Sequence, residues 1–148
     1  MSLKYWHGAH TKHRLLYHVV ILPKYRKRVL RGKLVYRLQG LFFEACTVNW
    51  WWIEEIKVLE DHVHFMIQIQ PTDCIADVVN TLKGGSSRVL RKEFPELEEF
   101  LWGDSFWSDG YFAETVGAAS YAQIKTYIKE NKESMPQANQ KPRPSGRE

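Results

Sequence analysis

The order of two hydrophobic periodicities along the chain is the feature that most restricts its fold. Strand-like stretches, rich in β-branched residues or alternating in polarity, lie at residues 15–22, 50–59, 62–70 and within 107–116. Helical spacing of apolar residues occurs at residues 32–48 and 75–94. The order β-α-β-β-α-β predicts an α+β fold of the ferredoxin-like or RRM-like type, with an antiparallel sheet and two helices on one face.

Polar residues at helix starts complete this outline. Asp73 is expected to be the N-cap of the second helix. Ser120 is expected to cap a further, C-terminal helix that carries Tyr127 and reaches about residue 134. The chain of 148 residues is about one domain, which we place at residues 1–134, although residues 1–13 show no clear periodicity. Residues 135–148 are polar and Pro-rich and are expected to be disordered.

Cysteine usage and hydropathy indicate a compartment. Cys46 and Cys74 are the two cysteines of the chain, and their spacing gives neither a CxxC motif nor a disulfide framework. The apolar run LLYHVVIL is far shorter than a membrane-spanning helix. We therefore expect a cytoplasmic protein with reduced thiols and no membrane partner.

Positive charge is concentrated in two places on a chain of net charge +4. Six basic residues crowd into positions 24–33, and a second group comprises Lys83, Arg88, Arg91 and Lys92. Such runs form a solvated face as often as a binding surface. An aromatic fraction of 14% supplies rings that could stack on bases, so the composition favours a polyanionic partner.

The segment EDHVHFMIQIQP places two histidines at the head of a predicted strand. Side chains alternate along a strand, so His62 and His64 share one face with Met66 and Gln68. Two imidazoles at this spacing can bind one divalent cation, or they can be ordinary half-exposed strand residues. A zinc hydrolase of the HxHxDH type is disfavoured because the residues that follow His64, beginning Phe65-Met66, do not supply the Asp-His pair that the pattern needs.

The C-terminal helix offers a further ligand and a nucleophile. Tyr127 and Asn131 are four residues apart and therefore share a helix face. An amide oxygen is an acceptable ligand for Mg²⁺ or Mn²⁺, and a tyrosine beside it can act as a nucleophile. The spacing alone is equally typical of an aromatic packing residue, and on that ground alone packing is the preferred interpretation.

Several ordered motifs together resemble one family. The segments HVVILPKYRKRVL, EDHVHFMIQIQP, LKGGSSRVLRKEFPEL, LWGDSFWSDGYFAETVG and YIKEN occur in the order and at the approximate spacing of the single-tyrosine HUH transposases. These TnpA-type enzymes move small insertion sequences as single-stranded DNA. The resemblance extends from about His18 to Asn131, and it identifies residues 1–134 as a transposase catalytic domain.

The resemblance implies roles for the matching residues. His62 and His64 would bind Mg²⁺ or Mn²⁺, and Tyr127 would be the nucleophile that forms a 5′-phosphotyrosine link. Asn131 stands where the family has a glutamine ligand and is one methylene shorter. The implied reaction is metal-dependent cleavage and rejoining of single-stranded DNA at the ends of an insertion sequence.

The resemblance also implies partners. The substrate would be single-stranded DNA with subterminal hairpins. A positive groove with aromatic platforms is the usual means of binding such strands, and the candidate DNA-binding residues are Lys24, Tyr25, Arg26, Arg28, Lys83 and Arg88. The family acts as a homodimer in which the tyrosine helix of one subunit completes the metal site of the other. Residues 117–119, Gly-Ala-Ala, could serve as the hinge for that exchange or form an ordinary turn.

Three other interpretations are compatible with the sequence. The chain could be a related HUH enzyme, such as a domesticated nuclease that acts on repeated palindromes or a replication initiator. It could be a non-catalytic nucleic-acid-binding module, if Asn131 disables the metal site. It could bind metal through His7, His10 and His13, although these residues lie in a segment without clear periodicity.

Overall fold

The structure is a computed structural model that describes residues 4–130. Its strands are β1 (Trp6–His7), β2 (Lys12–His13), β3 (Leu15–Ile21), β4 (Trp52–Leu59), β5 (His62–Ile69) and β6 (Phe112–Thr115). Its helices are η1 (Lys24–Arg26), α1 (Lys33–Asn49), α2 (Ile75–Glu93), η2 (Pro95–Leu97), α3 (Glu98–Leu101) and α4 (Ala118–Glu130). Within residues 4–130, no helix is both long enough and apolar enough to cross a membrane.

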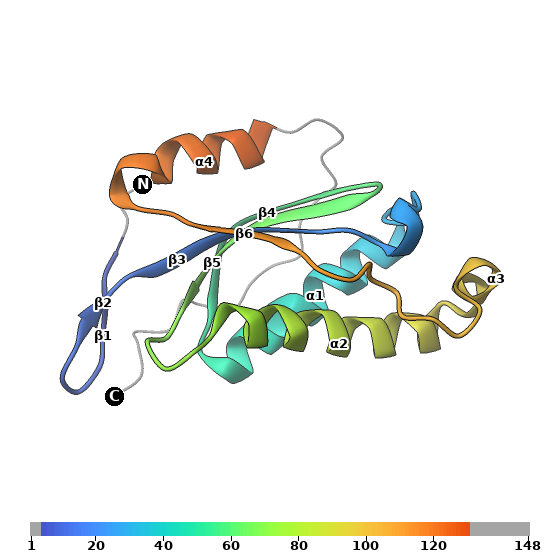
Figure 1. Ribbon diagram of the computed structural model, residues 1–148, viewed down its shortest axis with the longest axis horizontal. Helices are drawn as coiled ribbons and strands as arrows, with labels where there is room; N and C mark the ends of the chain where they lie inside the picture. The colour runs from blue at the N-terminus through green and yellow to red at the C-terminus, as the bar shows by residue number, and fades with distance from the viewer. Residues whose placement is uncertain (1–3, 131–148) are drawn as a thin grey trace.

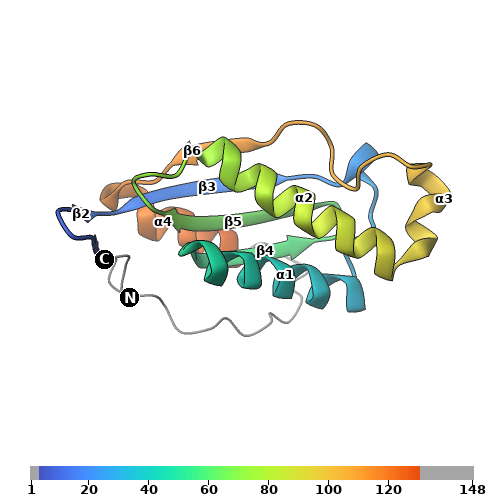
Figure 2. The same ribbon diagram turned by 90° about the horizontal axis from the view of Figure 1, so that it is seen from below.

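The main sheet confirms the predicted topology. Its strands are ordered β4-β5-β3-β6, and every neighbouring pair is antiparallel. With α1 after β3 and α2 after β5, this order is that of the ferredoxin-like fold. Figures 1 and 2 show α1 and α2 side by side on one face of the sheet, whereas α4 lies across the opposite face.

The larger core lies between the sheet and the helices α1 and α2. Alternation along β5 sends Val63, Phe65, Ile67 and Ile69 into this core, as the period of two predicts. The ring of Phe65 meets the ring of Phe42 from α1 edge to face, with centroids 5.5 Å apart. This layer makes β5 a rigid central strand, so the side chains on its opposite face are held in fixed positions.

A smaller core lies on the opposite face, beneath α4. It consists of the buried side chains Leu16, Met66, Val116, Tyr121 and Ile128. Met66 belongs to the face of β5 that also carries the two histidines, as predicted from the alternation. The apolar side of α4 therefore covers one part of that face and leaves the histidine end of it for other contacts.

Two predicted helix caps are wrong. The N-cap of α2 is Cys74, and the Asp73 carboxylate instead accepts hydrogen bonds from Trp51 Nε1 and the backbone N–H of Gln70, both at 2.8 Å. The helix α4 starts at Ala118, before Ser120, and the Ser120 hydroxyl lies 3.3 Å from the Gly117 nitrogen. In both cases the polar side chain contacts a backbone nitrogen that precedes the helix, and it does not cap the first helical turn.

The N-terminal segment, predicted as irregular, contains the hairpin of β1 and β2. In its register Trp6 is opposite His13, and His7 is opposite Lys12. His7 and His13 therefore point to opposite faces of the hairpin, which gives no support to the alternative of a metal site built from His7, His10 and His13. The predicted domain end at residue 134 and the tail 135–148 lie outside the described residues.

Candidate active site

Three histidines from two neighbouring strands meet on the α4 face of the sheet. His62 and His64 of β5 have ring centroids 4.6 Å apart, as their shared face predicts. His18 of β3 stacks on His64, with 3.3 Å between His18 Nε2 and His64 Nδ1. Sequence analysis missed His18, although a single polar residue within the apolar run LLYHVVIL was a usable signal.

The histidine contacts continue to the edge of the sheet. His18 Nδ1 lies 3.5 Å from Glu114 Oε2, which comes from the edge strand β6. The pairing of β3 with β6 places His18 directly opposite Glu114. Within residues 4–130, Nδ1 of His18 makes no hydrogen bond, and Glu114 is the charged neighbour beside it. The other ring nitrogen faces His64, so the stacked His18 ring limits the rotation of His64.

Burial controls the charge of His64. This residue is 6% exposed, and burial, together with the electrostatic effect of the neighbouring His62 and His18 rings, lowers its pKa to about 4. At neutral pH the ring is therefore uncharged, which is the form that binds a cation. Its Nδ1 faces His18, so Nε2 is the nitrogen that remains for a ligand.

The neighbouring His62 is oriented by a carboxylate. Its Nδ1 lies 2.7 Å from Asp61 Oδ1, in the turn between β4 and β5. Burial raises the pKa of Asp61, but hydrogen bonds and electrostatic attraction from His62 and Arg26 outweigh burial and leave that pKa below its usual value. A carboxylate on one nitrogen of an imidazole is the common outer support of a metal-binding histidine.

Tyr127 lies beside these histidines, on the exposed side of α4. Its ring centroid is 5.7 Å from that of His64 and 6.5 Å from that of His18, and the residue is 55% exposed. The rival Tyr121 is only 6% exposed, and its hydroxyl lies 3.3 Å from Glu54 Oε2. The two tyrosines therefore have different environments: Tyr121 packs in the small core, and Tyr127 presents its ring at the surface next to the histidines.

The end of α4 is fastened to the sheet by a buried lysine. Lys57 of β4 pairs with His64 across the sheet, and its Nζ donates to the Lys129 carbonyl oxygen at 3.3 Å. A cation at this position also suits the negative end of the helix dipole. The contact holds the last described turn of α4 over the histidines. Asn131 lies outside the described residues.

The donor atoms of the site supply part of the ligand set that the implied Mg²⁺ or Mn²⁺ ion needs. Across residues 4–130 there is no group of three or more His, Cys, Asp and Glu side chains that could hold an ion. His62 and His64 do fit the role of two ligands, because one is kept neutral and the other is supported by Asp61. A complete site needs a further ligand, and the predicted one is Asn131.

The predicted DNA-binding residues fall into two groups. Tyr25, Arg26, Arg28 and Arg88 are exposed. Arg88 also lines a hollow of about 480 Å³ between α2 and the loop before β6. Arg26, although exposed, donates from Nε to Asp61 Oδ2 at 3.0 Å. Lys24 and Lys83 are half-buried, and both direct their ammonium groups at the protein itself.

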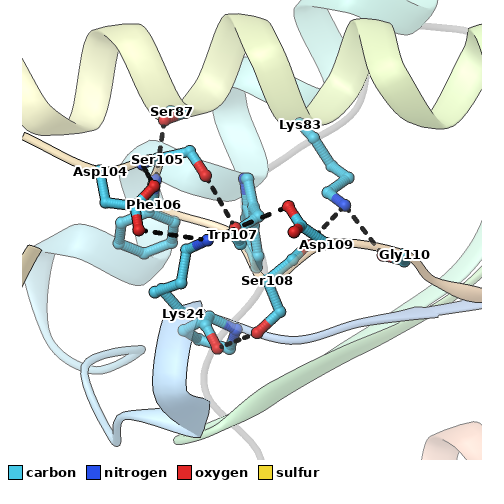
Figure 3. A network of polar contacts seen from close by, with 11 residues as sticks. Lys24, Lys83, Ser87, Asp104, Ser105, Phe106, Trp107, Ser108, Asp109 and Gly110 are labelled. Atoms are coloured by element: carbon cyan, nitrogen blue, oxygen red, sulfur yellow. Dashed lines mark hydrogen bonds and ion pairs between the residues drawn. The ribbon is translucent and has the colours of Figure 1, made fainter.

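Figure 3 shows the network that contains both lysines. Lys83 Nζ donates to the carbonyl oxygens of Ser108 and Gly110, each at 2.8 Å, and burial lowers the pKa of this lysine. Lys24 Nζ lies 3.5 Å from Asp104 Oδ2 and 4.0 Å from Asp109 Oδ1. The two lysines thus fasten the loop that leads into β6 to the end of β3 and to α2.

The fold and the tyrosine beside paired histidines agree with the class of enzyme that the sequence resembles, a DNA-cleaving and strand-transferring transposase. Residues 11–131 match the family described as Transposase IS200 like, and the chain belongs to this family. It is 34% identical to the ISDra2 transposase TnpA of Deinococcus radiodurans, over 82% of this chain and 86% of that protein. It is 32% identical to the transposase for insertion sequence element IS200 of Salmonella typhimurium, over 82% and 79% of the two chains.

Solved structures agree with this assignment. A Deinococcus radiodurans protein solved by crystallography as a candidate transposase has a TM-score of 0.70 and 32% identity, and the match covers 83% of this chain and 95% of that one. A REP-associated tyrosine transposase bound to a REP hairpin has a TM-score of 0.60, with 86% of this chain and 70% of that one covered. At 15% identity the second match supports the fold alone.

Proposed function

We propose that this transposase cleaves and rejoins single-stranded DNA at the ends of an insertion sequence, with Tyr127 as the nucleophile. The observation that carries the proposal is the position of the exposed Tyr127 ring, 5.7 Å from the neutral ring of His64. Tyr121 is buried and hydrogen-bonded, so Tyr127 is the better placed of the two tyrosines on α4.

The proposed metal ligands are His62, His64 and Asn131, and the proposed ion is Mg²⁺ or Mn²⁺. When bound, such an ion neutralises charge on the scissile phosphate and polarises its P–O bond. The support comes from the chain itself: Asp61 orients one imidazole, and burial keeps the other uncharged. His18 stacks on His64 and limits the rotation of its ring.

The proposed reaction is a transesterification at phosphorus. The Tyr127 hydroxyl oxygen forms a bond to phosphorus while the bond to the 3′ oxygen breaks. The phenolic proton passes to solvent, and the departing 3′ oxygen takes up a proton. One phosphodiester is exchanged for another, so a different 3′-OH can later attack the phosphotyrosine link and rejoin DNA without ATP. Exposure of Tyr127 leaves room for that second strand.

The proposed substrate is DNA with subterminal hairpins. A fold relative was solved with a REP hairpin bound, and this chain offers an exposed basic and aromatic surface at Tyr25, Arg28 and Arg88. Stacking on aromatic rings and contacts to phosphates are the usual means of binding single strands. Lys24 and Lys83 support this surface indirectly, through the loop they fasten. Action on chromosomal DNA implies the cytoplasm as the location.

We further propose a homodimer with shared active sites. The proposal rests on the resemblance alone, because in the described chain α4 packs on its own sheet through Met66, Tyr121 and Ile128. Gly117 precedes α4 and is the position at which the helix could pass to a second subunit. A mixed dimer of Tyr127→Phe with His64→Ala tests the exchange, because one intact site forms only if the helix crosses between subunits.

The cleavage assay that tests the function uses end-labelled single-stranded oligonucleotides that tile the DNA flanking the gene. The wild-type protein should cut one of them and form a covalent adduct on a denaturing gel when Mg²⁺ is present. The variants His62→Ala and His64→Ala should bind the hairpin but not cut it. Retention of the hairpin without any cleavage by the wild-type protein would identify a non-catalytic binding module instead.

A further inference from the structure

We infer that Arg26 is a positioning residue for the active site rather than a phosphate contact. It holds Asp61, and through Asp61 it holds the ring of His62. The inference rests on the proposed function only in that His62 is taken as a metal ligand. The contact chain from Arg26 to His62 belongs to the protein itself and can be measured without metal or DNA.

The two oxygens of one carboxylate are divided between two partners. Arg26 Nε donates to Asp61 Oδ2 at 3.0 Å, and His62 Nδ1 lies 2.7 Å from Asp61 Oδ1. Asp61 is partly buried, with a side-chain exposure of 21%. With both oxygens engaged, the carboxylate cannot rotate away from His62 without loss of the contact to Arg26.

This arrangement selects one form of the His62 ring. A carboxylate at Nδ1 favours the tautomer in which Nδ1 carries the hydrogen and Nε2 carries the lone pair. The lone pair at Nε2 is what a metal ion requires. Arg26 therefore contributes by holding the Asp61 carboxylate in place, although Arg26 itself does not contact the His62 ring.

The backbone that presents Arg26 is strained. Tyr25 has φ of 60° and Arg26 has φ of 52°, although neither is glycine. Consecutive non-glycine residues with left-handed φ persist only where the surrounding structure holds them. The turn of η1 is closed by a hydrogen bond from the Arg26 nitrogen to the Pro23 carbonyl oxygen at 2.8 Å.

Both ends of this turn are anchored. Before it, the Lys24 nitrogen donates to the Phe106 carbonyl oxygen at 2.7 Å, and the Lys24 side chain reaches Asp104, within the network of Figure 3. After it, the Leu30 nitrogen donates to the Glu60 carbonyl oxygen at 3.0 Å. Figure 1 shows the segment after β3 curling beside the tip of the β4–β5 hairpin. The anchors fix the turn at the place where Arg26 meets Asp61.

An ordinary surface ion pair would show none of these features. Exposed pairs contribute little to stability, and many have no measurable effect. Arg31 provides such a pair in the same segment: its Nη1 lies 3.6 Å from Glu60 Oε2, next to Asp61 in sequence. Arg31→Gln is therefore the matched control for Arg26→Gln, because it removes a neighbouring ion pair without touching the partner of His62.

The test compares Arg26→Gln and Arg31→Gln with the wild-type protein in two measurements. In metal-free protein, long-range ¹H–¹⁵N NMR reports which nitrogen of His62 carries the hydrogen. Titration with Mn²⁺, followed by electron paramagnetic resonance, reports affinity. We expect Arg26→Gln to mix the tautomers and to weaken Mn²⁺ binding by about 10-fold, the low end for loss of an outer partner. Arg31→Gln should match the wild type in both.

Asp61→Asn and a conservative variant sharpen the test. Asp61→Asn should weaken Mn²⁺ binding by roughly 10- to 100-fold, and addition of Arg26→Gln should weaken it no further, because Arg26 acts through Asp61. Arg26→Lys keeps the charge and should retain more of the wild-type tautomer than Arg26→Gln. Thermal melting of each variant establishes that it is folded.

Two results would overturn the inference. One is an Arg26→Gln protein that has the wild-type tautomer and Mn²⁺ affinity. The other is a drop of about 0.7 in the salt slope of single-strand binding for Arg26→Gln with an unchanged His62 ring, which would make Arg26 a phosphate contact. A wild-type protein that binds no Mn²⁺ would refute the proposed metal site, whereas the tautomer measurement would still decide the role of Arg26.

Discussion

The ring of Tyr127 lies 5.7 Å from the ring of His64, centroid to centroid, because the next residue on α4 anchors the helix. Ile128 is fully buried in the small core with Leu16 and Met66. Successive residues of a helix point about 100° apart, so burial of Ile128 directs Tyr127 toward the edge of the covered area. The histidines of β5 are at that edge.

Shortening the buried Ile128 side chain should lower both the stability of the protein and its activity. Ile128→Ala leaves a cavity beneath α4, and we expect it to lower the free energy of unfolding by about 2–5 kcal/mol. Adduct formation should fall with it under conditions where the protein remains folded, since Tyr127 loses its fixed position. Urea unfolding and a denaturing gel measure the two effects. Wild-type adduct yield in a clearly destabilised variant would show that Tyr127 does not depend on this packing.

Salt dependence should separate the two groups of basic residues. Arg28→Gln removes an exposed charge, so the log–log slope of single-strand binding against salt should become shallower by about 0.7. Lys83→Met should leave the slope unchanged and should lower stability by about 1–3 kcal/mol, because the carbonyl oxygens of Ser108 and Gly110 lose their donor. A shallower slope for Lys83→Met and an unchanged slope for Arg28→Gln would assign the phosphate contact to Lys83. Arg28 would then be an ordinary solvent-exposed residue.

Part of the candidate active site could be predicted from the sequence, because the positions of its two β5 histidines depend on local periodicity. The period of two on β5 was sufficient to place His62 and His64 on one face. His18 and Glu114 could not be placed in the same way, since their contact depends on the register of β3 with its neighbours. Such pairings join residues that are distant in sequence, and no local pattern encodes them.

Two other features of the structure could not be predicted from local sequence patterns. Lys24 and Lys83 have the composition of a phosphate-binding surface, yet the loop of residues 104–110 folds back and takes up both ammonium groups. The strands β1 and β2 are two residues long, which is too short for alternation to be visible. The fold class was predictable because it depends on six long or well-bounded elements, whereas these details depend on tertiary contacts.

The buried histidine should make stability depend on pH. The pKa of His64 is lowered to about 4, mainly by burial and then by the electrostatic effect of the His62 and His18 rings. In the unfolded chain His64 takes up a proton near its usual pKa of about 6.5. The stability gained from a neutral, buried His64 is therefore complete above that pH and is lost as the pH falls toward 4.

Urea unfolding of metal-free protein at pH 7 and pH 5 measures this effect. The wild-type midpoint should fall between the two conditions, and the fall should be smaller in His64→Gln, which has no proton to gain. An equal fall in both proteins would attribute the acid sensitivity to other groups.

The cysteines test the fold directly. Cys46 is buried in the larger core, where burial raises the pKa of its thiol, and Cys74 is exposed at the start of α2. A thiol reagent should therefore modify Cys74 rapidly and Cys46 only after unfolding. The Cys74→Ser variant should show almost no reaction in native buffer and one thiol in denaturant. Rapid modification of that variant in native buffer would contradict the packing of α1 on the sheet.

The central claim is that Tyr127 bonds to DNA, and peptide mass spectrometry of the trapped adduct tests it most directly. Trypsin cleavage after Lys125 and Lys129 releases residues 126–129, whereas Tyr121 falls in a different peptide. We predict that the nucleotide mass is carried on the 126–129 peptide, at Tyr127, and that Tyr127→Phe yields no adduct while Tyr121→Phe does. A nucleotide carried by the peptide that contains Tyr121, with adduct retained in Tyr127→Phe, would contradict the account.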